Sequence, residues 1–297
     1  MPSVPSGPIG VGMSEAQIID GLRAIAGDYD ALLCDAWGVI HNGQQLYPGA
    51  KEALLRFREE RGPVIVLTNA PRPSSVIPAQ LDRLGLPREA YDGVVTSGDA
   101  TAQIMANMQD KPFYRIGPSK DDGIYAQFDM TLTSLDEAEA IFCSGPNDDQ
   151  NETPEDYRSV LEPAAERGLP MVCANPDIVV KFGDKLIYCA GAIGQLYETM
   201  GGQVLLGGKP HAPIYDLAVA RIQEITGKAP GRLLAIGDGI DTDIRGANNQ
   251  DIDVVFVAEG IFAEAARIDG QLSGEALSRA LQERDVHAEY AMDTFAW

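Results

Sequence analysis

The stretch that decides the fold is Ala31-Leu32-Leu33-Cys34-Asp35-Ala36-Trp37-Gly38-Val39, in which an unbroken apolar run ends in a carboxylate. Unbroken apolar runs are typical of strands that are buried on both faces. Similar runs follow at 64–67, 94–95, 233–236 and 254–257, with amphipathic stretches of helical length between them. The pattern predicts βα units and therefore an α/β fold with a parallel sheet covered by helices.

The middle of the chain repeats the pattern on its own. Residues 100–204 contain strand-like runs at 113–116, 140–143, 171–174 and 186–189, and helical stretches near 154–167 and 191–200. We expect them to form a second α/β unit that is inserted into the first, which then comprises 13–99 and 205–297. Residues 1–12 are rich in Pro, Ser and Gly and are expected to form a flexible tail.

Composition limits the partners of the chain. The 297 residues carry 44 acidic and 23 basic side chains, a net charge of −21 that would repel nucleic acids and anionic membrane surfaces. A phosphorylated substrate would meet the same repulsion, so its site needs local cations. The four cysteines form no C-x-x-C pair and lie in apolar runs, which predicts buried thiols. No signal-like or membrane-spanning run is present, so we expect a cytoplasmic protein, whether monomer or homo-oligomer.

Polar side chains follow several of the predicted strands. Asp35 ends the first run, Thr68-Asn69 the second, and Asp238 and Asp243 follow the run at 233–236, while Lys209 precedes a helical stretch. The carboxyl ends of parallel strands gather at one edge of a sheet. Carboxylates there can bind a hard cation, a hydroxyl and amides can bind phosphate oxygens, and a lysine can offset charge. Each segment alone is a common turn, but their ordered combination predicts phosphoryl transfer.

The same segments resemble the motifs of a known family. The order Asp35–Val39, Leu67–Asn69, Gly208–Pro210 and Gly237–Asp243 is similar to the four motifs of the haloacid dehalogenase superfamily, and the match spans nearly the whole chain. The resemblance implies a Rossmann-like core with an inserted α/β cap of the C2 type. Residues 96–101 and 174–177 resemble the class IIA branch, which contains nucleotide, sugar and 4-nitrophenyl phosphate phosphatases.

The resemblance implies a metal-assisted nucleophile. Asp35 would attack phosphorus, carry a transient aspartyl-phosphate and bind Mg²⁺ through its other oxygen. The backbone carbonyl of Trp37 and the carboxylate of Asp238 would be further ligands, and Asp243 would orient ligands or water. Magnesium suits such a set because it favours oxygen ligands and bridges to phosphate.

Other positions are implied to hold the substrate, a small phosphorylated metabolite. Thr68 and the backbone of Asn69 would bind phosphate oxygens, and Lys209 would offset the charge of phosphate and nucleophile. Arg72 is a further candidate for the phosphate or the cap. The turn at 174–177, with Asn175 and Asp177, is expected to face the site from the cap.

The sequence departs from the family pattern at Trp37, where the resemblance leads us to expect a second aspartate that protonates the leaving oxygen. An indole donates a hydrogen bond but cannot shuttle a proton, and such catalysis is worth ~10²–10⁴-fold. Three explanations stay open: a substrate with a good leaving group, a surrogate acid such as His41, or a phospho-ligand-binding protein with weak or no catalysis.

Overall fold

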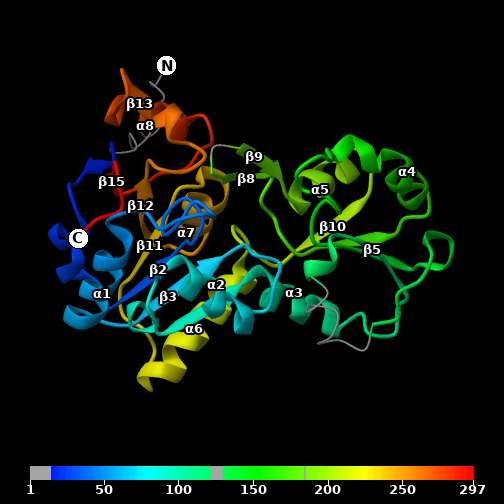
Figure 1. The fold of residues 1–297 in the computed structure, drawn as a ribbon, viewed down its shortest axis with the longest axis horizontal. Helices are drawn as coiled ribbons and strands as arrows, with labels where there is room; N and C mark the ends of the chain where they lie inside the picture. The colour runs from blue at the N-terminus through cyan, green and yellow to red at the C-terminus, as the bar shows by residue number, and fades with distance from the viewer. Residues whose placement is uncertain (1–14, 122–129, 184) are drawn as a thin grey trace, which may run out of the picture.

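The chain folds around two separate parallel sheets (Figure 1). The structure is a computed structural model and describes residues 15–121, 130–183 and 185–297. The tail predicted for residues 1–12 lies outside the described residues. The larger sheet is on the left of Figure 1 and the smaller one on the right, with the amino- and carboxyl-terminal parts of the chain both near the larger sheet.

The larger sheet has seven strands in the order β1-β15-β12-β11-β2-β3-β4, and every neighbouring pair is parallel. The predicted parallel-sheet α/β architecture is therefore confirmed. Its strands are β1 (Gln17–Ile18), β2 (Ala31–Cys34), β3 (Val64–Thr68), β4 (Gly93–Thr96), β11 (Leu233–Gly237), β12 (Asp253–Val257) and β15 (Tyr290–Met292).

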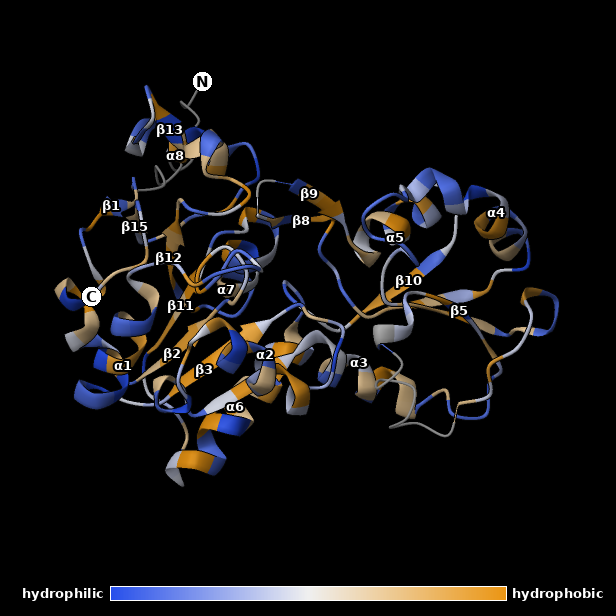
Figure 2. Cartoon of the chain, viewed as in Figure 1, coloured by the Kyte–Doolittle hydropathy of each residue, from blue (hydrophilic) through white to orange (hydrophobic). Residues whose placement is uncertain are grey.

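Helices cover both faces of the larger sheet because alternate residues of each strand point to opposite faces. Leu32 packs in the core with α1 (Ala50–Glu60) and α2 (Ile77–Leu84), whereas Leu33 packs with α6 (Ala212–Thr226). Next to them, α7 (Arg245–Asn249) and α8 (Gly274–Gln282) cover β12. Figure 2 shows the strands of the sheet as mainly apolar, in agreement with burial on both sides.

The smaller sheet is a second α/β layer with four parallel strands in the order β10-β7-β6-β5. One face packs on α4 (Arg158–Glu166) and α5 (Ala190–Thr199), and the other on α3 (Ser97–Ala106). The strands are β5 (Phe113–Ile116), β6 (Ala140–Cys143), β7 (Pro170–Cys173) and β10 (Gln203–Leu206). Two antiparallel hairpins complete the described strands: β8 (Val179–Phe182) with β9 (Lys185–Tyr188), and β13 (Arg267–Ile268) with β14 (Gln271–Leu272).

The chain passes between the two sheets at two neighbouring places. Helix α3 leads out of the larger sheet, and the segment after β10 leads back. At the return, Gly207 lies so close to α3 that a Cβ there would approach the backbone carbon of Ala100 to 2.9 Å. Strand β10 continues to Leu206, so the boundary predicted between residues 204 and 205 falls inside a strand. The division into core and inserted cap stays a prediction.

Two further expectations concern burial. All four cysteines, Cys34, Cys143, Cys173 and Cys189, are free and buried, as predicted. Within the described residues, no helix combines the length and the apolar character that a membrane crossing requires.

Candidate active site

A cavity of about 930 Å³ lies where the carboxyl ends of the two sheets face each other. Residues that follow β2, β3 and β11 line it from the larger sheet, and residues that follow β5, β6, β7 and β10 line it from the smaller sheet. Ligands collect at such strand ends because loops and helix starts converge there. Of the predicted site residues, all but His41 line this cavity: Asp35, Trp37, Thr68, Asn69, Arg72, Lys209, Asp238 and Asp243.

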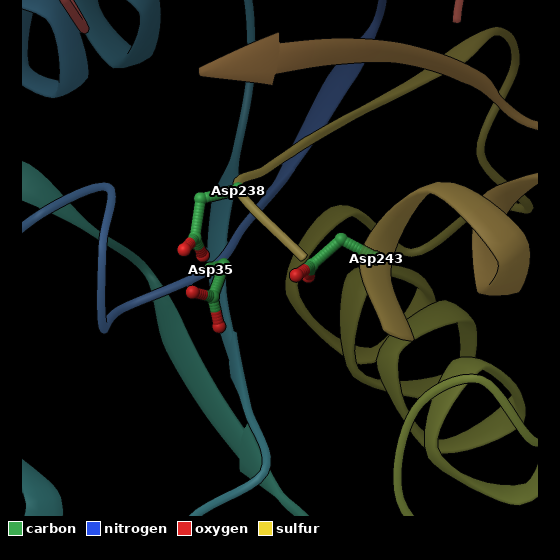
Figure 3. Close-up of side chains that lie close together, drawn as sticks. All are labelled: Asp35, Asp238 and Asp243. Carbon is green, nitrogen blue, oxygen red and sulfur yellow. The ribbon is translucent and has the colours of Figure 1, made fainter. Parts of the chain in front are cut away.

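Three carboxylates converge in the cavity. Asp35, Asp238 and Asp243 each offer an oxygen within 4.8 Å of the others, and all three are buried (Figure 3). Asp35 is fixed at the end of β2 because its N–H donates to Ile236 O on β11, at 2.9 Å. Asp238 follows β11, and Asp243 lies in the π-helix Ile240–Ile244. Two adjacent strands and the helix that follows them therefore bring these oxygens together.

Lys209 is the cation of this cluster. Its ammonium lies 2.5 Å from Asp35 Oδ1 and 2.6 Å from Asp243 Oδ1, and only 2% of the residue is exposed. Burial alone would lower the pKa of Lys209, but the charges of Asp243 and Asp35 outweigh it and raise that pKa well above its usual value. The lysine is therefore charged. One ammonium faces three carboxylates, and this imbalance disfavours ionisation of all three. Burial raises the pKa of Asp35 well above its usual value, and burial together with the nearby Asp243 raises the pKa of Asp238 to about 7.

The cluster fits a divalent cation. Lys209 occupies Asp35 Oδ1, and Ile261 N–H donates to Asp238 Oδ2 at 2.9 Å, so each of these two carboxylates keeps another oxygen for a ligand role. Both oxygens of Asp243 already accept hydrogen bonds, Oδ1 from Lys209 and Oδ2 from Gly239 N–H. All available donors are oxygens, which magnesium and calcium prefer. A bound ion of charge +2 would also balance the cluster.

Asn69 positions Lys209 through the lysine's own backbone. The Asn69 side chain accepts from Lys209 N–H at 2.8 Å and donates to Lys209 O at 3.1 Å. It also donates to Asp177 Oδ1 at 2.8 Å, which joins β3 of the larger sheet to the turn that follows β7. Asp177, like Asn175, lines the cavity from the smaller sheet.

Thr68 and Arg72 lie farther along the same wall. Thr68 ends β3, is 3% exposed, and its hydroxyl accepts from Ala70 N–H at 3.2 Å. The Arg72 guanidinium pairs with Asp121 at 3.2 Å, and its side chain is 30% exposed. Arg72 thus links the larger sheet to the turn after β5 and still reaches the cavity. Phosphate binding by either residue stays a prediction.

His41 lies behind the site rather than in its wall. It is 1% exposed, its Nδ1 accepts from Gly43 N–H at 3.0 Å, and its ring meets the Trp37 indole edge-on at 5.1 Å. Burial lowers its pKa to about 4, so the imidazole is neutral at pH 7. This placement supports packing beneath Trp37 and gives the predicted role of surrogate acid no support.

Gly38 is needed for the approach of Asp238. Its φ is 84°, a region that favours glycine, and a Cβ at this position would overlap the Asp238 carboxylate. The turn after Asp35 therefore depends on a residue without a side chain, because only then can the loop close on the carboxylate cluster.

Gly38→Ala should lower the free energy of unfolding by about 1–2 kcal/mol, the cost of a left-handed alanine, and should also weaken divalent-cation binding by moving Asp238. Urea denaturation and calorimetric titration with Mg²⁺ measure the two effects. Gly85→Ala is the matched control, because its φ is 95° but the nearest atom to an added Cβ is 4.0 Å away. Equal Mg²⁺ affinity in Gly38→Ala and Gly85→Ala would show that the close approach of Gly38 to the Asp238 carboxylate does not matter for cation binding.

Comparison with known proteins agrees with this geometry. Residues 32–131 match the family described as haloacid dehalogenase-like hydrolase, and residues 206–283 match the HAD-hydrolase-like family. A hydrolase of the haloacid dehalogenase-like family from Brucella suis 1330 is 37% identical, with a TM-score of 0.84 over 94% of this chain and 100% of that one. The chain belongs to the haloacid dehalogenase-like hydrolases.

Two more distant relatives of this haloacid dehalogenase-like chain carry functional names. D-glycerol 3-phosphate phosphatase of Mycobacterium tuberculosis is 26% identical over 81% of this chain and 66% of that enzyme, so the chain spans about two thirds of its length. The structure of a glycerol phosphate phosphatase from the same organism in complex with magnesium is 23% identical, with a TM-score of 0.62 over 86% of this chain and 78% of that one. At that identity the second likeness shows the fold alone.

The haloacid dehalogenase-like site also contains residues that the sequence analysis missed. Phe182 of β8 faces Trp37, with the ring centroids 6.1 Å apart and the planes inclined by 37°. Ile261 fixes Asp238 through its backbone. Gly183-Asp184 between two apolar-rich runs is a hairpin signal that could have revealed β8 and β9. No signal in the sequence pairs Phe182 with Trp37, because that contact joins distant segments.

Proposed function

We propose that this chain is a magnesium-dependent phosphatase that transfers the phosphoryl group of a small phosphorylated metabolite to Asp35 and then to water. The observation that carries the proposal is the contact of Lys209 with Asp35 inside a cluster of three carboxylates. The family and its phosphatase relative support the reaction type, and the oxygen donors of the carboxylate cluster support the choice of ion. In this proposal residues 100–204 form the cap.

The proposed roles follow from the geometry. Asp35 attacks phosphorus with one carboxylate oxygen, and the bond between phosphorus and the leaving oxygen breaks with its electron pair on that oxygen. Lys209 draws negative charge away from nucleophile and phosphate. Thr68 and the backbone of Asn69 hold phosphate oxygens, with Arg72 as a further contact. A water oxygen then attacks the aspartyl-phosphate, which releases the Asp35 carboxylate and phosphate and returns one proton to the leaving oxygen or to solvent.

The metal would be held by Asp35, Asp238 and the backbone carbonyl of Trp37, with Asp243 orienting Lys209 and nearby groups. When bound, Mg²⁺ supplies positive charge that offsets the charge on the phosphate oxygens. The fit rests on the oxygen donors and on the excess of three carboxylates over one ammonium in the cluster.

Asp238→Ala should weaken Mg²⁺ binding by at least about 10-fold, because even the loss of a residue that only orients metal ligands lowers metal affinity by about this factor. Activity should fall together with Mg²⁺ binding. Calorimetric titration measures the affinity, and thermal unfolding checks that the fold is kept. Asp110→Ala, an exposed aspartate after α3, controls for the loss of one negative charge. Unchanged Mg²⁺ affinity in Asp238→Ala would remove Asp238 from the proposed metal site.

A second function is a phospho-ligand-binding protein of the same fold with weak or no catalysis. The observation that favours it is Trp37, an indole at the position where the family resemblance leads us to expect an acid, with the surrogate candidate His41 buried behind it. Both functions need the same phosphate site. Turnover of a phosphorylated substrate that is lost in Asp35→Asn would support the phosphatase, whereas binding without turnover would support the binding protein.

A further inference from the structure

The turn after β7 reaches Lys209 through a single side chain. Asp177 Oδ1 accepts a hydrogen bond from Asn69 Nδ2 at 2.8 Å, and the same Asn69 amide bonds to the backbone of Lys209 on both sides of its Cα. Both N–H bonds of the amide are thus used, one by Lys209 O and one by Asp177. A carboxylate from residues 100–204 is therefore only one side chain away from the lysine that contacts Asp35.

Asp177 is anchored in the smaller sheet by its own backbone. Its N–H donates to Asn175 Oδ1 at 3.0 Å, and its carbonyl accepts from Gly191 N–H in the first turn of α5 at 3.1 Å. A Cβ on Gly191 would overlap Asp177 O, so the helix packs directly on the turn. Because both hydrogen bonds use the backbone, the turn does not need the Asp177 side chain, which instead bonds to a residue of the larger sheet.

The position of the Lys209 ammonium depends on how its backbone is held. A lysine side chain is a flexible stem of four carbons, so the ammonium is placed by its backbone at one end and by its charged partners at the other. Asn69 fixes the backbone, and Asp35 and Asp243 hold the ammonium. The Asp177 carboxylate fixes the Asn69 amide in turn, and a hydrogen bond to a charged group contributes more than a neutral one.

Other contacts between residues 100–204 and the rest of the chain do not reach Lys209. Three of them lie at the cavity: Arg72 with Asp121, Phe182 with Trp37, and Gly183 N–H with Asn42 O. None of these three involves Lys209 or a residue that hydrogen-bonds to it. The Asn69–Asp177 bond is therefore the contact through which the turn after β7 can act on the lysine.

We infer that Asp177 is a positioning residue, which sets Lys209 through Asn69 while the turn after β7 lies against the end of β3. The inference rests on the proposed function, in which Lys209 draws negative charge away from nucleophile and phosphate. Separation of the two sheets would break the Asn69–Asp177 bond and loosen the backbone of Lys209. Full stabilisation of charge would then be reached only when the two sheets are docked around the cavity.

Hydrogen exchange of the Lys209 backbone amide tests the inference without turnover. That N–H donates to Asn69 Oδ1, so Asp177→Ala should speed its exchange by about 10-fold or more, the scale of losing a hydrogen bond to a charged group. Asp177→Asn can still accept from Asn69 and should stay within about threefold of the wild type. Exchange of the β2 amides should be unchanged in both variants, which checks that the fold is kept.

Asp149→Ala is the matched control for the loss of a carboxylate. Asp149 also lines the cavity from the smaller sheet, and its Oδ1 accepts from Gln150 Nε2 at 2.9 Å. This variant should change exchange of the Lys209 amide by less than about twofold, as is usual for substitutions outside a specific network.

Steady-state kinetics with acetyl phosphate and Mg²⁺ measures the consequence for the reaction. Asp177→Ala should lower kcat about 10-fold and change KM by less than about threefold, because a misplaced Lys209 weakens the stabilisation of charge in the transition state more than substrate binding. Asp177→Asn should restore most of kcat. Asn69→Ala should cause a similar loss, and adding Asp177→Ala to it should cause no further loss, since the two residues act in series.

Unchanged exchange of the Lys209 amide in Asp177→Ala, or additive losses of kcat in the double variant, would overturn the inference. Turnover that is lost in Asp35→Asn but equal in Asp177→Ala and the wild type would also overturn it and would leave the phosphatase standing. Faster exchange in Asp177→Ala, in a protein without Asp35-dependent turnover, would refute the phosphatase and support Asp177 as the residue that positions Lys209.

Discussion

Asp35→Asn is expected to lower kcat for every phosphorylated substrate by at least about 10³-fold, since removal of a nucleophile costs this much or more in enzymes that form covalent intermediates. An amide oxygen is a poor nucleophile and yields no stable acyl phosphate. The fold should be kept, because Lys209 retains its contact with Asp243 at 2.6 Å and the cluster loses one of its uncompensated charges. Release of inorganic phosphate with Mg²⁺ measures the effect.

The control for this experiment is Asp216→Asn, an exposed aspartate on α6 away from the cavity, which should keep wild-type activity. Phosphate release from the Asp35→Asn variant at more than a tenth of the wild-type rate would show that another group attacks phosphorus. Acid-stable labelling of the wild-type protein by substrate at low temperature would add direct support for the covalent intermediate, and the variant should not be labelled.

Trp37→Asp should raise turnover of alkyl phosphates such as glycerol 3-phosphate by up to about 10²-fold, the scale of general acid–base catalysis. The new carboxyl group can protonate the leaving oxygen and later activate water. Aryl phosphates should gain much less in the first step, because a phenol has a pKa of about 10 and its oxide leaves without protonation. Steady-state and burst-phase rates on both substrate types measure these changes.

Trp37→Asn is the matched control, because it removes the indole, has the size of aspartate and cannot shuttle a proton. Both variants lose the ring that packs against Phe182 and His41. The difference between their turnover rates therefore gives the effect of proton transfer alone. Thermal unfolding and Mg²⁺ affinity must be followed in both, since the new carboxylate adds charge next to a site that already has a negative excess. Folded, metal-bound Trp37→Asp with no gain over Trp37→Asn would mean that position 37 does not limit proton transfer.

The larger sheet could be predicted because its strands are unbroken apolar runs. The run at 31–34 is β2 to the residue, and the amphipathic stretch expected between the runs at 31–34 and 64–67 contains α1. The edge strand β1 and its neighbour β15 were missed, because runs of two or three residues do not stand out from loops. The strand-like run at 186–189 was recognised but belongs to a hairpin, as β9, rather than to the parallel sheet. Local pattern reveals a strand, whereas its partner is set by distant packing.

The candidate site was predictable to the extent that it follows from strand ends. Asp35 and Thr68 come directly after an apolar run, Asp238 comes two residues after one, and a parallel sheet brings such residues to one edge. The sequence could not show that His41 turns inward beneath Trp37, or that the Asn69 side chain forms hydrogen bonds with the backbone of Lys209. Both contacts depend on the three-dimensional path of a loop, which the spacing of residues along the sequence does not reveal.

The closeness of the two chain passages, where Gly207 touches the backbone of α3 at Ala100, bears on how such a protein can be built. An insertion whose two ends already adjoin adds little to the entropy of closing the host chain, and that entropy grows only slowly with the number of inserted residues. On the proposed division into core and inserted cap, the larger sheet can therefore accept insertions of very different size at this junction while its own folding changes little. Exchange of residues 100–204 for another insertion would alter which molecules can enter the cavity. The carboxylates at the strand ends of the larger sheet would stay unchanged.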